Sequence, residues 1–487
     1  MRILYLDIDT LRPDHMGCYG YSRNTTPNLD KIAEEGIVFE NYYTSDAPCL
    51  PSRAALFFGR YGIHTGIVGH GGTAADQRIT GPERSFTNQE DRNTYHMLYK
   101  KAGMYAASIS TFPERHSAWW YNAGFNEMHN IGEAGHESGE KVLPVALDWL
   151  DRNKDRDNWY LHLHLWDPHT PYRAPEDFGR PFENTPLHDD WITDEVFAKH
   201  IRKAGPHSAS DLNGMSGGDN PNYPRYPGSL KTHADVKRFI DDYDTGILYA
   251  DHLLGQVTDL LKAQGVYDDT AIIISSDHGE NMGELGLYAE HGTADNITCR
   301  IPMIVKWPGG AKGRDSGLRC NVDLAPTMAD LLGQPHSKKW DGKSYANLFE
   351  GNPAPARDSL VISQQAHVCQ RSARFGDWIY IRTIRDGFHL FDDEMLFNIK
   401  DDPHEQWDVK EKHPEICAQG AKIILDWQEE MMKTSDSDID PMWTVYREGG
   451  PFHANDRDFE YYMKRLETSG RGEAAGQLRV KYQVNKQ

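Results

Sequence analysis

The stretch best suited to chemistry is residues 47–58, Ala-Pro-Cys-Leu-Pro-Ser-Arg-Ala-Ala-Leu-Phe-Phe, with Cys49 near its start. Proline is common in a first helical turn, so Pro51 and the apolar run behind it predict a helix that begins just after the cysteine. Unpaired N–H groups and the helix dipole favour an anion there, either the Cys49 thiolate or a substrate oxyanion. Most lone cysteines are instead small buried hydrophobes, so neighbouring residues must decide between these interpretations.

Three strand-like segments are each followed by carboxylate or imidazole groups: Asp9, Asp277 with His278, and Asp167 with His169. One such ending is commonly a helix cap, but three are harder to explain as caps. Parallel sheets bind ligands at the carboxyl ends of their strands, and Asp9, Asp277 and His278 would offer an oxygen-rich set to Ca²⁺ or Mg²⁺. Zn²⁺ is less expected, because it needs more nitrogen or sulfur ligands. Asp7 shares a strand face with Asp9, but the more terminal Asp9 is the better ligand candidate.

Strand-like and helix-like segments alternate over most of the chain. Apolar or alternating runs predict strands at 2–9, 105–109, 159–166, 271–274 and 302–305. Apolar residues at helical spacing predict helices at 26–36, 95–102, 142–152 and 235–264. This alternation predicts an α/β fold in which a large, mostly parallel sheet carries helices on both faces.

Two segments interrupt the alternation. Residues 205–230 are rich in Gly, Ser, Asn and Pro and predict a long surface loop or lid. The Pro-rich passage 351–356 precedes short alternating runs at 359–363, 378–383 and 390–391, a helix near 414–432, and a tail from residue 434 without clear periodicity. We therefore expect an α/β domain with the candidate site at 1–355. A smaller C-terminal subdomain at 356–487 would contain a short antiparallel sheet, a helix and an irregular tail.

Composition restricts the classes of function. The 487 residues are 38% hydrophobic with 12 Trp and 24 Tyr, which indicates a folded globule. The net charge of −21 argues against nucleic acid or anionic membranes as partners, and no apolar run reaches membrane-spanning length. The first strand-like segment starts directly after Met1 and leaves no room for a signal peptide, so we expect a cytoplasmic protein unless a leader was omitted. The six scattered cysteines suggest reduced thiols.

The segment Cys49-Leu-Pro-Ser-Arg53 resembles the C-x-P-S-R motif of the type I sulfatases, in the alkaline phosphatase superfamily. Further resemblances follow in order along the chain, at 6–12, 17–20, 26–29, 167–171, 276–279, 301–308, 323–327, 341–342, 396–398 and 402–403. Nearly the whole chain up to about residue 430 is therefore covered. Chance agreement at so many spaced points is remote.

The resemblance implies an enzyme that hydrolyses sulfate esters. In this family a maturation enzyme oxidises the motif cysteine to formylglycine, whose hydrate attacks sulfur. The alcohol then leaves, and the second hydroxyl allows sulfate to be expelled. The cation, Ca²⁺ in this family with Mg²⁺ or Mn²⁺ as alternatives, polarises sulfate oxygens and lowers the pKa of the attacking hydroxyl. The expected substrate is a small-molecule or carbohydrate sulfate ester.

The resemblance also implies roles for individual residues. The metal ligands would be Asp9, residue 49, Asp277 and His278. Arg53 would orient the nucleophile and offset its charge. His169 would lie in the substrate pocket, as a candidate proton donor to the leaving oxygen.

Three positions depart from the family pattern. Many members carry two adjacent aspartates where this chain has Asp9 followed by threonine, so the metal would have one carboxylate fewer. A Lys-x-His pair common after the strand at 105–109 is absent, and Arg115 and His116 are the candidates to replace it. A lysine usual after the second acidic motif is also missing, which leaves His291 as its replacement.

Two further residues are candidates for substrate contact. His70 lies in a Gly-rich loop behind the nucleophile helix, where it would either approach a ligand or remain solvated. Trp119 would stack on a sugar ring, although adjacent aromatics such as those at 119–121 are at least as often core residues.

Two other functions stay open at this point. Related enzymes that hydrolyse phosphonate monoesters or phosphodiesters use the same C-x-P-S-R nucleophile, and the missing lysines keep that alternative open. A catalytically silent binding protein on the same fold is less expected, because the nucleophile, Arg53 and the metal ligands are all present.

Overall fold

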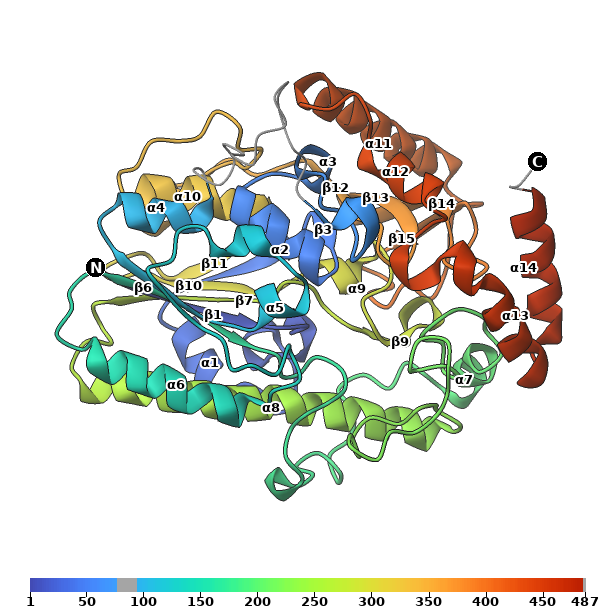
Figure 1. The fold of residues 1–487 in the computed structure, drawn as a ribbon, viewed down its shortest axis with the longest axis horizontal. Coiled ribbons are helices and arrows are strands. Elements are labelled where there is room, and N and C mark those ends of the chain that lie inside the picture. Colours follow the sequence, from blue (N-terminus) through green and yellow to red (C-terminus); the bar gives the residue numbers. More distant parts are fainter. Residues whose placement is uncertain (77–93, 485–487) are drawn as a thin grey trace.

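The computed structural model describes residues 1–76 and 94–484, and its centre is an eight-stranded sheet (Figure 1). The strand order is β11-β2-β10-β7-β1-β6-β4-β5. These strands are β1 (Arg2–Ile8), β2 (Ile37–Tyr43), β4 (Tyr105–Ile109), β5 (Glu127–His129), β6 (Trp159–Leu165), β7 (Thr270–Ser275), β10 (Met303–Lys306) and β11 (Gly313–Cys320). Neighbours pair in parallel except β10, which runs antiparallel to β7 and β2. The predicted mostly parallel sheet is confirmed.

Strand β1 lies between β7 and β6, and its register determines where the three strand ends meet. Ile8 is paired with Leu165, and Asp7 with Ser275. Residues 3–8 are all buried, as a nearly continuous apolar sequence predicts for a central parallel strand. The polar residues that follow these three strands therefore reach the same edge of the sheet.

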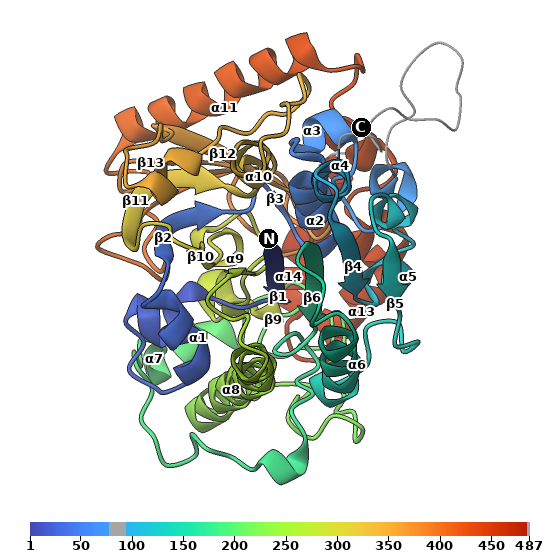
Figure 2. The same ribbon diagram turned by 90° about the vertical axis from the view of Figure 1, so that its left-hand side faces the viewer.

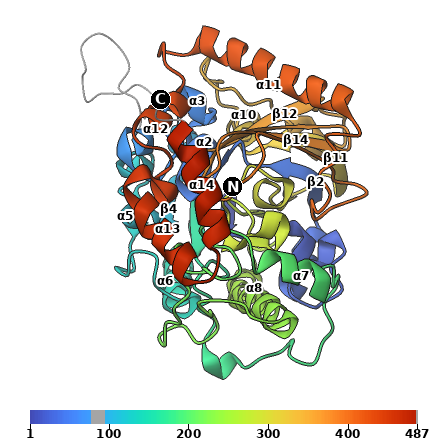
Figure 3. The same cartoon turned by 90° about the vertical axis from the view of Figure 1, so that its right-hand side faces the viewer.

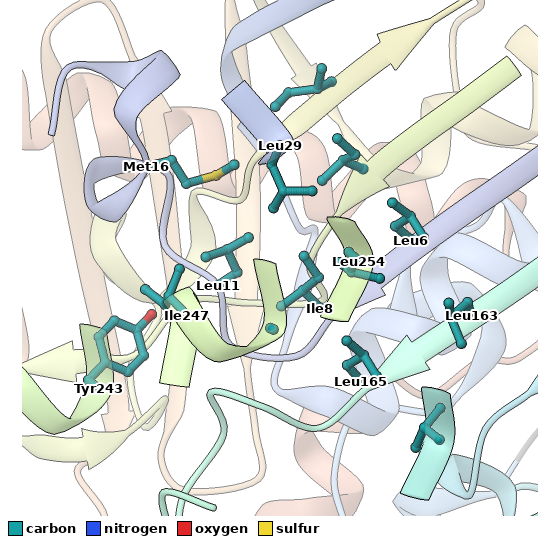
Figure 4. Packing of buried hydrophobic residues seen from close by; sticks show 14 of the residues in the cluster. Leu6, Ile8, Leu11, Met16, Leu29, Leu163, Leu165, Tyr243, Ile247 and Leu254 are labelled. Atoms are coloured by element: carbon teal, nitrogen blue, oxygen red, sulfur yellow. The ribbon is translucent and has the colours of Figure 1, made fainter. Parts of the chain in front are cut away.

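Helices cover both faces of the sheet, as predicted (Figure 2). One face carries α1 (Pro27–Ala33), α6 (Gly139–Arg152) and α8 (His233–Ala263); the other carries α2 (Cys49–Phe58), α4 (Tyr95–Lys101) and α10 (Leu324–Leu331). Alternate residues of β1 supply the two cores. Leu6 and Ile8 pack with the first group (Figure 4), and Ile3 and Tyr5 pack with the second. The two-residue period of a strand explains this division.

The C-terminal part forms a five-stranded sheet in the order β15-β14-β13-β12-β3, packed against α11 (Pro414–Thr434). Its strands are β12 (Ser359–Gln364), β13 (Cys369–Phe375), β14 (Trp378–Arg385), β15 (Glu394–Asn398) and the two-residue β3 (Asp46–Ala47), which pairs in parallel with β12. The predicted antiparallel sheet and helix are confirmed, but the strand expected at 390–391 lies at 394–398. Strand β13 was not predicted, because its polar residues hide the apolar pattern of a strand that is buried throughout.

The tail is largely helical, so the prediction of an irregular segment is wrong. It contains α12 (Pro441–Arg447), α13 (Phe459–Thr468) and α14 (Gly472–Val484), and the last two lie together on one side of the molecule (Figure 3). Phe459, Tyr462, Met463 and Leu466 recur at spacings of three and four residues, so α13 buries one apolar face, which packs with Phe388. This periodicity is short and flanked by charged residues, which is why the sequence interpretation overlooked it.

Short elements connect the larger ones. They include α3 (Gly62–Thr65), α5 (Phe112–Arg115), α7 (Asp194–His200), α9 (Asn296–Cys299), β8 (Asn281–Met282) and β9 (Tyr288–Glu290). Residues 205–230 are irregular, but Leu212, Tyr226 and Leu230 are buried in the main core, so this predicted loop is anchored to the body. Within 1–76 and 94–484, no helix combines the length and apolarity needed to cross a membrane.

Replacing Leu6 by Ala should lower the free energy of unfolding by about 2–5 kcal/mol, because the side chain is fully buried and a cavity would remain. The midpoint of urea denaturation, followed by tryptophan fluorescence, measures the effect. The control is Leu425→Ala in α11, where the side chain is 56% exposed and the change should stay below about 0.5 kcal/mol. Equal losses in the two variants would contradict the position of Leu6 in the core.

Candidate active site

Cys49 lies at the amino end of α2, in an environment that favours an anion. The helix begins at Cys49 itself, not just after it as predicted. The side chain is buried, and its Sγ lies 3.1 Å from Nε2 of His278 and 3.9 Å from Nε2 of His291. Burial alone would raise the pKa of Cys49, but the positive charge of His278 and hydrogen bonds from nearby imidazoles hold it well below its usual value. This surrounding distinguishes Cys49 from an inert core cysteine.

Asp9, Asp277 and His278 gather around Cys49. Each of the four residues offers one ligand atom, and these atoms all lie within 4.8 Å of one another. Oδ1 of Asp9 is buried and has no hydrogen-bond partner among the described residues. A cation would satisfy that oxygen, and two carboxylates with one imidazole and residue 49 suit a divalent ion. The structure thus brings together all four predicted metal ligands.

The guanidinium of Arg53 is shared by three buried carboxylates. Its Nε and Nη2 donate to the Asp7 carboxylate at 3.1 and 3.2 Å. Its Nη1 lies 3.1 Å from Oδ2 of Asp9 and donates to Oδ2 of Asp277. Burial would raise the pKa of Asp7, but the charge of Arg53 holds it well below its usual value. Arg53 therefore positions the carboxylates around the candidate metal site. Asp7 in turn holds the Arg53 guanidinium in place through two hydrogen bonds.

Two histidines of β6 complete this network and were not identified from the sequence. Nε2 of His164 lies 2.9 Å from Nη2 of Arg53 and 3.3 Å from Oδ2 of Asp9. Nε2 of His162 lies 3.2 Å from Oδ2 of Asp7. Both histidines alternate with leucines along β6, so one face of that strand is polar. The alternation was visible in the sequence, but its meaning depended on β6 being the neighbour of β1.

His291, the predicted replacement for the missing lysine, is an imidazole held by a carboxylate. Its ring stacks on that of His278, with centroids 3.9 Å apart. Its Nε2 lies 2.8 Å from Oε1 of Glu290. Burial opposes charge on His291, but Glu290 raises its pKa well above the usual value. A positive charge is thus placed beside residue 49, where it would stabilise an anion.

A cavity of about 560 Å³ opens in front of Cys49. Part of its wall comes from the irregular segment 205–230 and from the tail at Phe452 and His453, and no residue of these two segments was predicted to line a pocket. Seven histidines from segments far apart in the chain are among the lining residues: His70, His116, His169, His207, His291, His367 and His453.

Most of the predicted pocket residues line this cavity, including Arg115, His116, His169 and His70. The Arg115 guanidinium lies over a ring of Trp166, 5.0 Å from its centroid. Burial lowers the pKa of His116 to about 4. Trp119 is different, because it is 48% exposed and lies outside the lining residues. The structure therefore does not bring Trp119 to the cavity.

Comparison with known proteins identifies the family. The sulfatase family model matches residues 2–334 of this chain. The chain belongs to the sulfatase family. This sulfatase is 26% identical over 432 residues to the choline-sulfatase of Rhizobium meliloti (strain 1021), covering 79% of the chain and 77% of that relative. It is 24% identical over 517 residues to an N-acetylglucosamine-6-O-sulfatase of Bacteroides thetaiotaomicron, covering 92% of the chain and 89% of that relative.

These matches confirm the resemblance to type I sulfatases of the alkaline phosphatase superfamily and show an enzyme that hydrolyses sulfate esters. Among solved structures, the phosphonate monoester hydrolase of Agrobacterium radiobacter superposes on this sulfatase with a TM-score of 0.67 at 18% identity. The alignment covers 88% of this chain and 96% of that one. At this level of identity the likeness shows a shared fold.

Replacing Arg53 by Met should lower the free energy of unfolding by about 3–5 kcal/mol and abolish sulfate release, because three buried carboxylates lose their shared counter-charge. Arg53→Lys should retain more stability than Arg53→Met but remain inactive, since one ammonium cannot reproduce a planar fork of N–H groups. Thermal unfolding and sulfate release measure the two effects. The matched control is Arg152→Met, whose side chain is 48% exposed. A fully stable Arg53→Met variant would contradict the role of this network.

Proposed function

We propose that this sulfatase uses a formylglycine formed from Cys49, together with Ca²⁺, to release inorganic sulfate from a small-molecule or carbohydrate sulfate ester. The supporting observation is that residue 49 shares a 4.8 Å cluster with Asp9, Asp277 and His278 and also lines the cavity. The proposal includes oxidation of Cys49 by a formylglycine-generating maturation enzyme. Mg²⁺ and Mn²⁺ are the alternative cations.

Asp9, Asp277, His278 and residue 49 would hold the cation, which would polarise sulfate oxygens, and formylglycine at position 49 would supply the attacking hydroxyl. The protein fixes the geometry. Oγ of Ser52 donates to the backbone oxygen of Asp277 at 2.6 Å, so the serine of C-x-P-S-R ties α2 to the end of β7. The backbone N–H of Thr10 donates to Oδ1 of Asp277 at 3.3 Å. Residue 49 and the carboxylates are thereby held together before substrate binds.

Three imidazoles beside residue 49 suit different roles in the proposed hydrolysis. His291 carries the positive charge stabilised by Glu290, which suits contact with sulfate oxygens. His116 is neutral near pH 7, because burial lowers its pKa to about 4, so it would accept a hydrogen bond or a proton. His169 lines the cavity near His291, with ring centroids 5.4 Å apart. We assign to His169 the transfer of a proton to the leaving oxygen.

The size and lining of the cavity support a small substrate. A volume of about 560 Å³ is within the range of small-molecule sites. Asn213, Asn220 and Tyr223 line the wall contributed by segment 205–230 and would hydrogen-bond hydroxyl groups. The names of the relatives, a choline-sulfatase and an N-acetylglucosamine-6-O-sulfatase, also support a compact alcohol or sugar as the group that carries sulfate.

Hydrolysis of phosphonate monoesters or phosphodiesters is the second candidate. It is favoured by one observation: the two family lysine positions are occupied by other groups, with His291 and the Arg115-His116 pair as the candidate replacements. Parallel assays with an aryl sulfate, an aryl phosphonate monoester and an aryl phosphodiester separate the candidates. We expect the sulfate to be hydrolysed fastest. Much faster turnover of the phosphonate than of every sulfate tested would overturn the first proposal.

Mass spectrometry of the peptide that holds Cys49 tests the nucleophile. Protein made with a formylglycine-generating enzyme should show an aldehyde at residue 49, and sulfate release should increase with the modified fraction. The variant Cys49→Ala should lack the aldehyde and be inactive. Unmodified thiol in fully active protein would contradict the formylglycine mechanism.

Replacing Asp277 by Ala should remove bound Ca²⁺ and activity together, with a loss of turnover above about 100-fold. Metal content is measured by plasma mass spectrometry after dialysis, and turnover by sulfate release. Asp151→Ala is the control, because that carboxylate is 64% exposed on α6, outside the candidate metal cluster. Full turnover by Asp277→Ala without metal would contradict the assignment of the metal site.

A further inference from the structure

The cavity holds a second group of imidazoles, which the proposed hydrolysis does not use. His70, His367 and His453 each offer one nitrogen, and the three nitrogens lie within 4.8 Å of one another. His70 follows α3, His367 lies in the turn between β12 and β13, and His453 precedes α13, so three distant segments converge here. The donors are all nitrogen, whereas the cluster around residue 49 is rich in oxygen.

The backbone holds these three histidines in place. Nδ1 of His70 lies 2.9 Å from Nε2 of His453, and the rings of His453 and His367 are stacked with centroids 4.2 Å apart. The N–H of His453 donates to the backbone oxygen of Ala366 at 3.0 Å. Oε1 of Gln364 accepts the N–H of His367 at 3.3 Å. The imidazoles therefore meet in a built arrangement and not by the chance contact of free side chains.

Two nitrogens of this group have unmet bonding capacity. Nε2 of His367, on a side chain that is 4% exposed, has no hydrogen-bond partner among the described residues. Nε2 of His70, the ring nitrogen outside the contact with His453, has none there either. The carboxylate oxygen Oε1 of Glu290 is 3.6 Å from Nε2 of His367, beyond hydrogen-bond distance. Burial is costly for an imidazole nitrogen without a partner.

We propose that His70, His367 and His453 form a second metal site, which binds Zn²⁺. Tetrahedral Zn²⁺ at about 2.0–2.1 Å from each nitrogen sets ligand nitrogens about 3.3 Å apart. Nδ1 of His70 and Nε2 of His453 are 2.9 Å apart in a hydrogen bond that the ion would replace. The rings of His367 and His453 are stacked at an interplanar angle of 8°, so they would turn to direct their nitrogens at the ion. Imidazole suits Zn²⁺ and neighbouring transition metals, whereas Ca²⁺ prefers oxygen. Ligand chemistry would thus separate two cations within one cavity.

The position of this site would leave the ion open to the cavity and link two segments of the chain. All three histidines line the cavity, so a fourth coordination position is open to water or to an oxygen of a bound molecule. The ion would also join the segment at His453 to the loop at His70. That contact already has one hydrogen bond, from Oγ1 of Thr73 to Oε1 of Glu448. Zn²⁺ would therefore add a second link between the tail and this loop.

Zn²⁺ titration in a Cys49→Ala background tests the proposal, because removal of the thiol prevents strong Zn²⁺ binding beside residue 49. With Ca²⁺ present in excess, calorimetry should show one Zn²⁺ per chain. Co²⁺ used as a probe should give the visible absorption of a four-coordinate ion with nitrogen ligands. His367→Ala and His453→Gln should each weaken Zn²⁺ binding at least tenfold. Absence of stoichiometric Zn²⁺ binding would overturn the proposal.

Control variants keep the result interpretable. His413→Ala removes a side chain that is 40% exposed, outside this cluster, and should leave the affinity unchanged. His207 belongs to an alternative group with Glu290 and His367. Loss of Zn²⁺ binding in His207→Ala, with normal binding in His70→Ala and His453→Gln, would overturn the assignment. In EDTA, the thermal unfolding midpoint of each histidine variant should match that of the parent protein. This match shows that a variant that no longer binds Zn²⁺ has lost a ligand and not its fold. None of these measurements depends on sulfate hydrolysis.

Discussion

The sharing of Arg53 among Asp7, Asp9 and Asp277 is the interaction on which the rest of the site depends. Three buried carboxylates close together repel one another, and ionising them away from water is costly without a counter-charge. A planar guanidinium has enough N–H groups to reach all three. The arginine can do this only because α2 packs with the arginine side facing the ends of β1 and β7. The spacing of C-x-P-S-R therefore places residue 49 and the positively charged Arg53 one helical turn apart on α2.

The position of residue 49 is also coupled to both sheets. The two-residue strand β3, directly before Pro48, pairs with β12 of the C-terminal sheet. Within α2, Ser52 contacts the backbone of Asp277 at the edge of the central sheet. Residue 49 is thus held between two sheets that are distant in sequence. A substitution in β12 would therefore shift residue 49 through the pairing of β12 with β3, although β12 itself lies outside the cavity lining.

The cavity separates two kinds of electrostatic environment. Near residue 49, carboxylates are paired with Arg53, and His291 is charged because Glu290 holds it. Farther out, His367 and His453 are neutral because burial dominates, and the pKa of His453 is lowered to about 3. On a chain with a net charge of −21, such local positive charge is what an anionic ester would encounter. Neutral imidazoles would recognise the remainder of the substrate or a soft cation.

The sequence alone determined the family, the α/β class and the core of the site. C-x-P-S-R is recognisable because its chemistry requires those residues at that spacing, and Asp9 and Asp277 are recognisable because each follows an apolar strand. Helix α13 was also visible in principle, through the spacing of its apolar residues. Local patterns of this kind depend on neighbours along the chain, so sequence reasoning can reach them.

Only the tertiary structure decided which strands are neighbours and which distant segments meet. His162 and His164 gained a role because β6 pairs with β1, and strand order is not encoded in any local pattern. The cavity wall from segment 205–230 and the imidazole of His453 were likewise unpredictable, because irregular segments are held by non-local packing. The sequence thus identified Cys49 and its predicted metal-ligating partners, while long-range packing decided what surrounds them.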